Sequence, residues 1–203
     1  NRDILKELKP YHIEDKTIEQ QFQDLICNNV RSIALNWADC GKIKGFKMNI
    51  KLKPDWKPWN VPCYSSNYRF EEEMDKQCEL LVAADFIEEC EPCNCPVTTS
   101  PVFAAKPGGE WRMCMDYILC NKNTIKDLYQ IPNLNHILSE LNGFLYYTSL
   151  DIRHGYYHIE VEEESRKYTA FRTFKKIYQW KRMPMGLVNA PAVFQRAMDT
   201  IFK

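Results

Sequence analysis

Asp151 is the residue best placed to do chemistry, because it stands at the centre of a β-rich run over residues 147–159. Residues 146–150 are mostly β-formers, which predicts a buried strand that ends at Asp151. Gly155 is expected to turn the backbone before a second apolar strand over residues 156–161. A carboxylate at a strand end can hold a metal ion, but most aspartates in such places are solvated turn or cap residues. Both interpretations of Asp151 stay open on this run alone.

A second unusual run lies at residues 182–195. The first run reads Asp-x-x-x-Gly-Tyr from Asp151, and the second reads Met-Pro-x-Gly-Leu-x-Asn-Ala-Pro-x-x-Phe-Gln from Met183. Together they resemble the reverse transcriptases of gypsy-type LTR retrotransposons and, more distantly, of retroviruses. Residues 111–117, 121–127 and 166–171 extend the resemblance, which covers roughly residues 45 to 203.

The resemblance implies an α+β fold: the fingers subdomain of a right-hand polymerase plus part of the palm, with an antiparallel sheet and packed helices. It implies an N-terminal helical lead-in over residues 1–45, fingers with a β-hairpin over residues 46–140, and a partial palm over residues 141–203. That partial palm would end before the Tyr-x-Asp-Asp hairpin of the family. With 203 residues, of which 45% are hydrophobic, the chain can bury one large core or two smaller ones.

The chemistry that the resemblance implies is RNA-directed DNA synthesis, an in-line phosphoryl transfer that uses two magnesium ions. Asp151 would be the catalytic carboxylate that bridges both ions. Two hard ions need further carboxylates, and the family supplies them from the Tyr-x-Asp-Asp hairpin. The sequence contains no Asp-Asp dipeptide. We therefore expect a retrotransposon-derived fragment that is inactive on its own.

Nucleotide contacts follow from the same resemblance. The arginine after the hairpin tip is Arg112, whose planar guanidinium suits triphosphate oxygens, and Lys106 can add a point charge. Tyr156 falls at the sugar-selecting position, where a ring under C2 favours deoxynucleotides, although Tyr157 could take the inward place instead. The full expected set for the deoxynucleoside triphosphate is Lys106, Arg112, Ile152, Tyr156, Met185 and Gly186.

The charges of the chain are balanced, with 27 basic and 27 acidic residues, so the protein lacks the basic excess of many nucleic-acid binders. They are segregated, however. Residues 165–182 hold seven basic side chains and no acidic one, interleaved with aromatic rings, and residues 71–91 are the acidic counterpart. This pattern predicts either a surface for an RNA/DNA template-primer or a solvated antiparallel face. The expected nucleic-acid contacts are Arg166, Lys167, Arg172, Lys175, Lys176, Lys181, Arg182 and Gln195.

The nine cysteines have no regular spacing, which predicts reduced thiols in an intracellular protein of the cytoplasm or nucleus. Cys90 and Cys93, with Cys95 nearby, have zinc-like spacing but lack a second ligand pair, so zinc binding is left open. No run of 18 apolar residues and no secretory signal is present, and we expect no membrane association.

Sequence periodicity predicts the elements that must position these residues. Helices are expected over residues 16–34, 70–85, 133–141 and from Asn189, which would cap its helix ahead of Pro191. Strands are expected over residues 47–52, in a hairpin of residues 101–106 and 111–117, and over residues 167–173 and 177–183.

Two further expectations concern partners. Without the family's last palm hairpin, the strand that carries Asp151 would leave a bare apolar edge, which predicts a homo-oligomer or a protein partner that covers it. The alternative to a polymerase domain is a domesticated retroelement-derived protein or nucleic-acid interaction module without catalysis.

Overall fold

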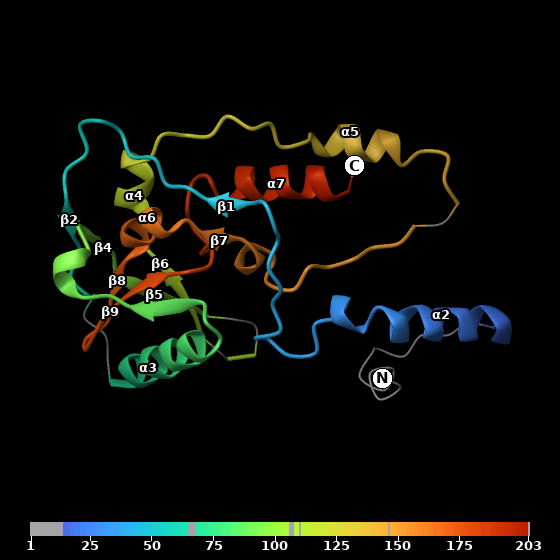
Figure 1. Ribbon diagram of the computed structural model, residues 1–203, viewed down its shortest axis with the longest axis horizontal. Helices are drawn as coiled ribbons and strands as arrows, with labels where there is room; N and C mark the ends of the chain where they lie inside the picture. The colour runs from blue at the N-terminus through green and yellow to red at the C-terminus, as the bar shows by residue number, and fades with distance from the viewer. Residues whose placement is uncertain (1–13, 65–67, 106–107, 110, 146, 203) are drawn as a thin grey trace. The chain divides into compact units, whose positions relative to one another are not determined.

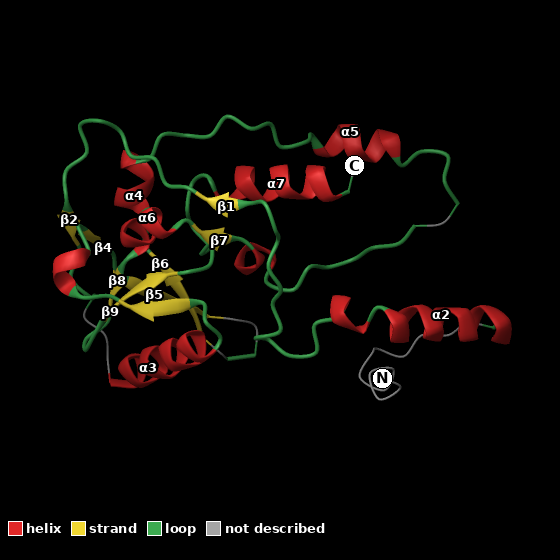
Figure 2. Cartoon of the chain, viewed as in Figure 1, coloured by secondary structure: helices red, strands yellow, loops and turns green. Residues whose placement is uncertain are grey.

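The computed structural model describes residues 14–64, 68–105, 108–109, 111–145 and 147–202, and the chain divides into two compact units, residues 1–41 and 42–203. Figure 2 shows that helices and short strands are mixed along the chain. In the described part of the chain, no helix is both long and apolar enough to cross a membrane.

The first unit contains helix α2, Lys16–Asn28, followed by the 3-10 turn Val30–Ser32 (Figure 1). Asp15 caps the helix, because its Oδ1 atom accepts hydrogen bonds from the backbone N–H groups of Thr17 and Ile18 at 2.7 and 3.3 Å. The predicted helix is confirmed, but it ends at Asn28 rather than near residue 34. The Asn29 side chain donates to the Leu25 carbonyl at 2.9 Å, which gives one of the last carbonyl groups of the helix a hydrogen-bond partner.

The second unit contains the predicted hairpin, formed by β5 (Pro101–Ala105) and β6 (Trp111–Met115) in antiparallel register. Helix α3, Tyr68–Ala83, packs against β6, as Figure 1 shows. Met74, Cys78 and Leu81 of α3 are buried, so the predicted amphipathic helix is confirmed, but Val82, which was expected on the same apolar stripe, is exposed.

A three-stranded antiparallel sheet joins β3 (Ile87–Glu89), β9 (Ile177–Trp180) and β8 (Phe171–Arg172), in the order β3-β9-β8. The prediction of a strand from residue 167 is wrong: helix α6, Glu163–Arg166, leads directly into the 3-10 turn Lys167–Thr169. The Thr169 hydroxyl stabilises this turn, because it donates to the Arg166 carbonyl at 2.7 Å and accepts from the Trp180 N–H at 2.9 Å.

Two strand pairs are parallel, whereas the predicted sheet was antiparallel. β1 (Lys47–Met48) pairs with β7 (Glu160–Val161), and β2 (Trp59–Asn60) pairs with β4 (Val97–Thr98). Both pairs join segments far apart in sequence, as parallel pairing requires. The core over these strands includes the fully buried side chains of Met48, Phe86, Val97, Ile159 and Phe171.

The segment that carries Asp151 differs most from the prediction. Residues 147–152 form no strand, and Leu150 is 83% exposed. A strand needs a neighbour for its backbone hydrogen bonds, and none of the described strands pairs with this segment. Residues 156–161 are not one strand either, because the 3-10 turn Gly155–His158 precedes the short strand β7.

The remaining helices are α4 (Ile118–Asn123), α5 (Leu134–Glu140) and α7 (Ala190–Ile201). α5 is confirmed, but none of its residues is buried. α7 begins where predicted and packs against β1 and the turn Gly155–His158. Asn189 occupies the N-cap position as predicted, but its side chain makes no capping hydrogen bond. It donates instead to the Ile125 carbonyl at 2.8 Å and accepts from the Asp127 N–H at 3.0 Å.

A disulfide joins Cys90 and Cys95 across the 3-10 turn Pro92–Asn94. The prediction that all nine cysteines are reduced is therefore wrong for this pair, because the turn brings two cysteines five residues apart within bonding reach. Cys93 stays a free, exposed thiol. Since Cys90 and Cys95 bind each other, the three cysteines do not form a shared zinc site, and the described residues contain no other cluster suited to a metal.

Candidate functional site

A pocket of about 520 Å³ brings together residues from the two runs that the sequence singles out. Four of the predicted site residues line it: Asp151, Ile152, Tyr156 and Met185. The other lining residues are Leu150, Gly155, Phe194, Met198 and Phe202. The pocket is therefore mostly apolar, and Asp151 is the single carboxylate among these lining residues.

A tight turn places Asp151 and Tyr156 on the same pocket. His154 adopts a left-handed backbone with φ of 52°, and the 3-10 turn Gly155–His158 follows at once. The left-handed residue is thus His154 and not Gly155, to which the sequence assigns the turn. Gly155 is needed for packing, because a β-carbon there would approach the Phe194 ring to 2.9 Å.

The Tyr156 ring is held edge-on against Phe194, with ring centroids 5.4 Å apart. Partial burial raises the pKa of the Tyr156 phenol, so this group stays neutral at physiological pH. Tyr157 points to a different environment, stacked on Trp180 at 5.5 Å and close to Phe86 at 4.9 Å. Of the two adjacent tyrosines, Tyr156 is therefore the one that lines the pocket.

Met185 reaches the pocket from a loop that contacts Tyr117 and Asn121. Gly186 has a left-handed φ of 95°, which lets the backbone turn above the Tyr117 ring. The Asn121 side chain clamps this loop, because it donates to the Gly186 carbonyl and accepts from the Val188 N–H, both at 2.8 Å. Gly186 itself does not line the pocket.

Asp151 is exposed and is the only carboxylate among the residues that line the pocket. The described residues contain no group of three or more His, Cys, Asp or Glu side chains that could hold a metal ion. A magnesium ion prefers six oxygen ligands. These residues therefore do not form a two-magnesium centre by themselves, and Asp151 would contribute one carboxylate to such a centre.

Arg112, one of the two hairpin residues expected to contact phosphates, is not among the residues that line the pocket. Arg112 is exposed on β6, opposite Ala104 of β5. Lys106 lies outside the described residues. The structure thus leaves the phosphate contacts of the hairpin as a prediction.

Most basic residues of the predicted nucleic-acid surface pair with the acidic segment. Lys175 contacts Asp75, Lys181 contacts Asp85, Lys176 contacts Glu89 at 2.7 Å, and Arg166 contacts Glu88 at 3.1 Å. Lys167 has a weaker contact of 3.9 Å with Glu164. The two charge runs identified in the sequence are therefore partners of each other, across the face shared by α3, β3 and β9.

The remaining two of the seven basic residues, Arg182 and Arg172, lie in different surroundings. Arg182 is buried, with 5% of its surface exposed, and donates to the Tyr157 carbonyl at 3.1 Å. Arg172 is half-buried and makes no ion pair with any residue that the structure describes. Among the seven basic residues, Arg172 alone is both accessible and without a carboxylate partner in the described chain.

Comparison with known proteins shows which domain the chain contains. Residues 104–203 match the model described as reverse transcriptase (RNA-dependent DNA polymerase). The chain carries a reverse-transcriptase-like domain. Over its whole length the chain is 34% identical to Polyprotein P3 of Commelina yellow mottle virus, of which it covers 10%. It is 38% identical, over 71% of its length, to the retrovirus-related Pol polyprotein from transposon 297 of Drosophila melanogaster, of which it covers 14%.

Further relatives place the reverse-transcriptase-like domain within much longer proteins. The enzymatic polyprotein of Cauliflower mosaic virus (strain CM-1841) is 34% identical over 83% of the chain, which covers 25% of that polyprotein. The crystal structure of prototype foamy virus protease-reverse transcriptase has the same fold, with a TM-score of 0.81 and 24% identity, over 98% of this chain and 26% of that one. The foamy viral protease-reverse transcriptase in complex with an RNA/DNA hybrid gives a TM-score of 0.77 at 19% identity, over 99% of this chain and 26% of that one.

The sequence alone did not identify every residue that shapes the pocket of this reverse-transcriptase-like domain. Phe194 and Met198 line it from α7, and Phe202 lines it directly after that helix; only their helical spacing in the sequence hinted at a shared face. Gln195 points elsewhere: its amide donates to Asp199 at 2.8 Å, and Asp199 also accepts from the Tyr129 hydroxyl at 2.6 Å. Gln195 is therefore held beside the pocket and is not part of its lining.

Proposed function

We propose that this chain is the fingers and first part of the palm of a gypsy-type Pol polyprotein, an RNA-directed DNA polymerase, and that the pocket receives the incoming deoxynucleoside triphosphate. One observation carries the proposal. The pocket gathers Asp151, Tyr156 and Met185 from two separate sequence runs, both of which resemble the polymerase motifs. An ordinary surface hollow has no reason to collect these residues in particular.

The lining suits a nucleotide, with its flat base and partly apolar sugar. Tyr156 presents a neutral aromatic ring that is kept in place by Phe194. Such a ring can exclude a 2′-hydroxyl by steric contact, which favours the deoxy sugar. Asp151 stands at the polar edge, where it would supply one of the carboxylates that hold magnesium in a complete polymerase. Magnesium would supply the charge stabilisation for phosphoryl transfer.

The proposed partners are an RNA/DNA template-primer and a deoxynucleoside triphosphate. The fold likeness to the foamy viral enzyme in complex with an RNA/DNA hybrid supports the choice of nucleic acid. The chain spans between 10% and 25% of the curated relatives described above, so catalysis is proposed for the whole polyprotein and not for this chain alone.

Photo-crosslinking tests the proposed pocket directly. A photoreactive deoxynucleoside triphosphate is added to the chain together with template-primer and magnesium, and labelled peptides are mapped by mass spectrometry. We expect labels within residues 150–156 or 185–202, and competition by unlabelled deoxynucleotide. Labelling that is spread evenly over the chain, or that unlabelled nucleotide does not reduce, contradicts the proposal.

A second function, as a protein interaction module, is favoured by one specific observation. Large apolar side chains are exposed along residues 128–150, among them Leu128 at 88%, Leu145 at 87% and Leu150 at 83%. Exposed apolar surface of this kind marks protein contacts. We propose that a second copy of the chain or another protein segment covers it. A clean monomer in sedimentation velocity at high concentration, unchanged by Leu145→Ser, contradicts this second proposal.

A further inference from the structure

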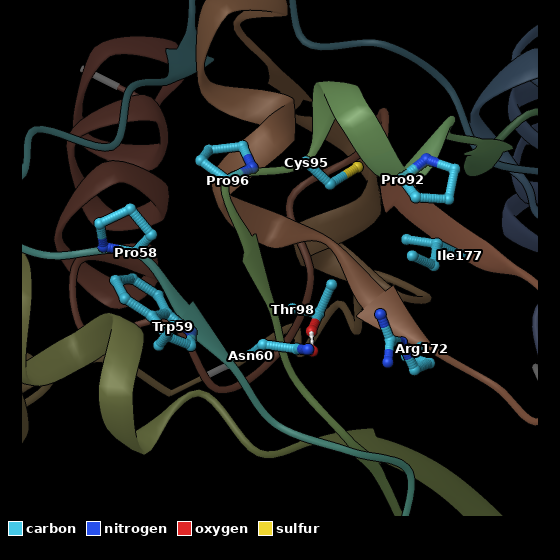
Figure 3. Close-up of a pocket in the computed structure, with 9 residues that line it drawn as sticks. All are labelled: Pro58, Trp59, Asn60, Pro92, Cys95, Pro96, Thr98, Arg172 and Ile177. Carbon is cyan, nitrogen blue, oxygen red and sulfur yellow. Dashed lines mark hydrogen bonds between the residues drawn. The ribbon is translucent and has the colours of Figure 1, made fainter.

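A second hollow, of about 230 Å³, lies where two of the sheets meet (Figure 3). Trp59 and Asn60 belong to β2, and Thr98 belongs to the adjacent parallel strand β4. The next residue, Thr99, bridges to Phe171 of β8, and Arg172 follows it. Three separate segments therefore meet at one hollow that the proposed nucleotide pocket does not include.

Part of the lining of this hollow is apolar. Trp59 and three prolines (Pro58, Pro92 and Pro96) belong to this part together with Cys95 and Ile177, and Figure 3 draws them as sticks. Trp59 is held in turn by the edge of Trp56, with ring centroids 6.2 Å apart. An ordered aromatic ring beside proline faces is a surface on which a planar group can stack without much loss of side-chain freedom.

The polar groups of the hollow lie at one side. The Thr98 hydroxyl donates to the Asn60 side-chain oxygen at 2.5 Å, which leaves the Asn60 amide N–H groups for a ligand. Arg172 is the third polar residue that lines the hollow. Its six basic neighbours in residues 166–182 are paired with carboxylates or, for Arg182, buried, whereas Arg172 has no ion pair within the described chain.

We propose that this hollow binds one nucleotide of a single-stranded nucleic acid, with the base on Trp59 and the adjacent phosphate on Arg172. A guanidinium is planar and donates in a fork that matches phosphate oxygens. A base fills the flat space between the ring and the prolines, and the Asn60 amide meets its edge. The inference deepens the proposed function, on which it rests only for the choice of nucleic acid as ligand.

An acidic peptide is the other class of ligand that Arg172 could attract. The geometry favours a nucleotide, because a carboxylate side chain would use the arginine but leave the aromatic and proline walls unfilled. Stacking on the ring does not depend on base identity, so the site is expected to accept any sequence. RNA and DNA should also bind alike, since the proposed contacts leave out the 2′-hydroxyl.

Fluorescence anisotropy of the chain with labelled single-stranded 12-mers of RNA and of DNA tests the site. Trp59→Leu and Arg172→Ala should each weaken binding by about tenfold, which is within the range of one lost base stack. Arg172→Lys should recover only part of the loss, because it keeps the charge and loses the fork. Lys76→Ala removes the same charge from an exposed position on α3 and should change affinity by less than about twofold.

A second readout separates binding from mere folding. The slope of log affinity against log salt should be smaller by about 0.7 in Arg172→Ala, as expected for one lost phosphate contact on a single strand. The indole N–H signal of Trp59, assigned by its loss in Trp59→Leu, should shift when the oligonucleotide is added. Melting curves should show that all variants remain folded.

Three results would overturn the inference. Unchanged affinity in both Trp59→Leu and Arg172→Ala excludes the hollow as the oligonucleotide-binding site. In that case, nucleotide labelling at Tyr156 in the crosslinking experiment would leave the proposed function intact. An octaglutamate peptide that binds through Arg172 when the 12-mers do not bind assigns the hollow to a protein ligand. Failure of the wild-type chain to bind any of the 12-mers also excludes the hollow as a nucleic-acid site. The crosslinking experiment at the pocket lined by Asp151 and Tyr156 then tests the proposed function separately.

Discussion

The ring of Phe194 lies so close to the α-carbon of Gly155 that a β-carbon at residue 155 would come within 2.9 Å of the Phe194 Cζ atom. The same ring meets Tyr156 edge-on. One aromatic side chain of α7 therefore fixes both the backbone and the tyrosine at the candidate nucleotide pocket. This contact explains why the glycine is needed, although its own backbone is not left-handed.

Gly155→Ala should destabilise the chain by about 1–3 kcal/mol, because the added methyl group overpacks a filled contact. The variant should also displace the Tyr156 ring. Urea unfolding measures this loss of stability. In a chain that already carries Phe194→Leu, adding Gly155→Ala should cost much less stability than it does in the wild type. Purely additive losses would show that the two residues do not compete for the same space.

Asp127 and Arg196 should give the stability of the second unit a specific dependence on pH. The Arg196 hydrogen bond, at 2.7 Å, holds the pKa of the Asp127 carboxyl below its ordinary value of 3.8. Because the folded pKa is the lower one, this stabilisation is fully present above about pH 3.8 and is lost as the pH falls through the folded pKa. Asp127→Asn should lower the free energy of unfolding by about 0.5–1 kcal/mol near pH 7, and by less in strong acid.

The control for this prediction is Asp55→Asn, which changes the charge of an exposed aspartate without an ion pair among the described residues. Urea midpoints of wild type and both variants should be measured from neutral pH to about pH 2.5. A wild-type advantage over Asp127→Asn that stays constant across this range would mean that the ion pair is not its source.

The acidic segment should mask the basic one from nucleic acid. Asp75→Asn, Asp85→Asn and Glu89→Gln together release Lys175, Lys181 and Lys176 from their partners. Affinity for any nucleic acid should rise by about threefold or more at low salt, and its salt dependence should steepen. Charge reversal of the three lysines should weaken binding to all sequences about equally. If neither set changes the anisotropy titration, this face does not contact nucleic acid.

Much of the fold could be predicted from the sequence, because its strongest local patterns are also its real elements. The apolar stripe of Met74, Cys78 and Leu81 gave helix α3, and the turn between residues 105 and 111 gave the hairpin. The segment at residues 147–152 was mispredicted, since β propensity describes a residue's fitness for a strand but cannot supply a pairing neighbour. The parallel pairs were missed because they join segments far apart in sequence.

The sequence motifs indicated part of the pocket lining. Asp151, Ile152, Tyr156 and Met185 do meet at one pocket. The charge pairing of Lys176 with Glu89 could not be seen, because it depends on β3 lying beside β9. The disulfide of Cys90 and Cys95 was likewise set by a local turn that spacing alone does not reveal.

The isolated chain should show no primer extension with template, deoxynucleotides and magnesium. Asp151 is the only carboxylate among the described residues that line the pocket, and one carboxylate cannot hold two magnesium ions. Asp151→Asn should therefore leave the background rate unchanged. Extension that survives removal of contaminating polymerases, and that disappears in Asp151→Asn, would show instead that the chain builds a complete centre.

The most direct measurement of the central claim compares deoxy- and ribonucleoside triphosphate binding to the chain in the presence of template-primer and magnesium. If the pocket is the nucleotide site, wild type should bind the deoxynucleotide more tightly, since the Tyr156 ring excludes the 2′-hydroxyl. Tyr156→Ala should abolish this preference, whereas Tyr157→Phe, which alters the tyrosine stacked on Trp180, should keep it. Equal binding of both sugars by wild type, or a preference that survives Tyr156→Ala, would contradict the account.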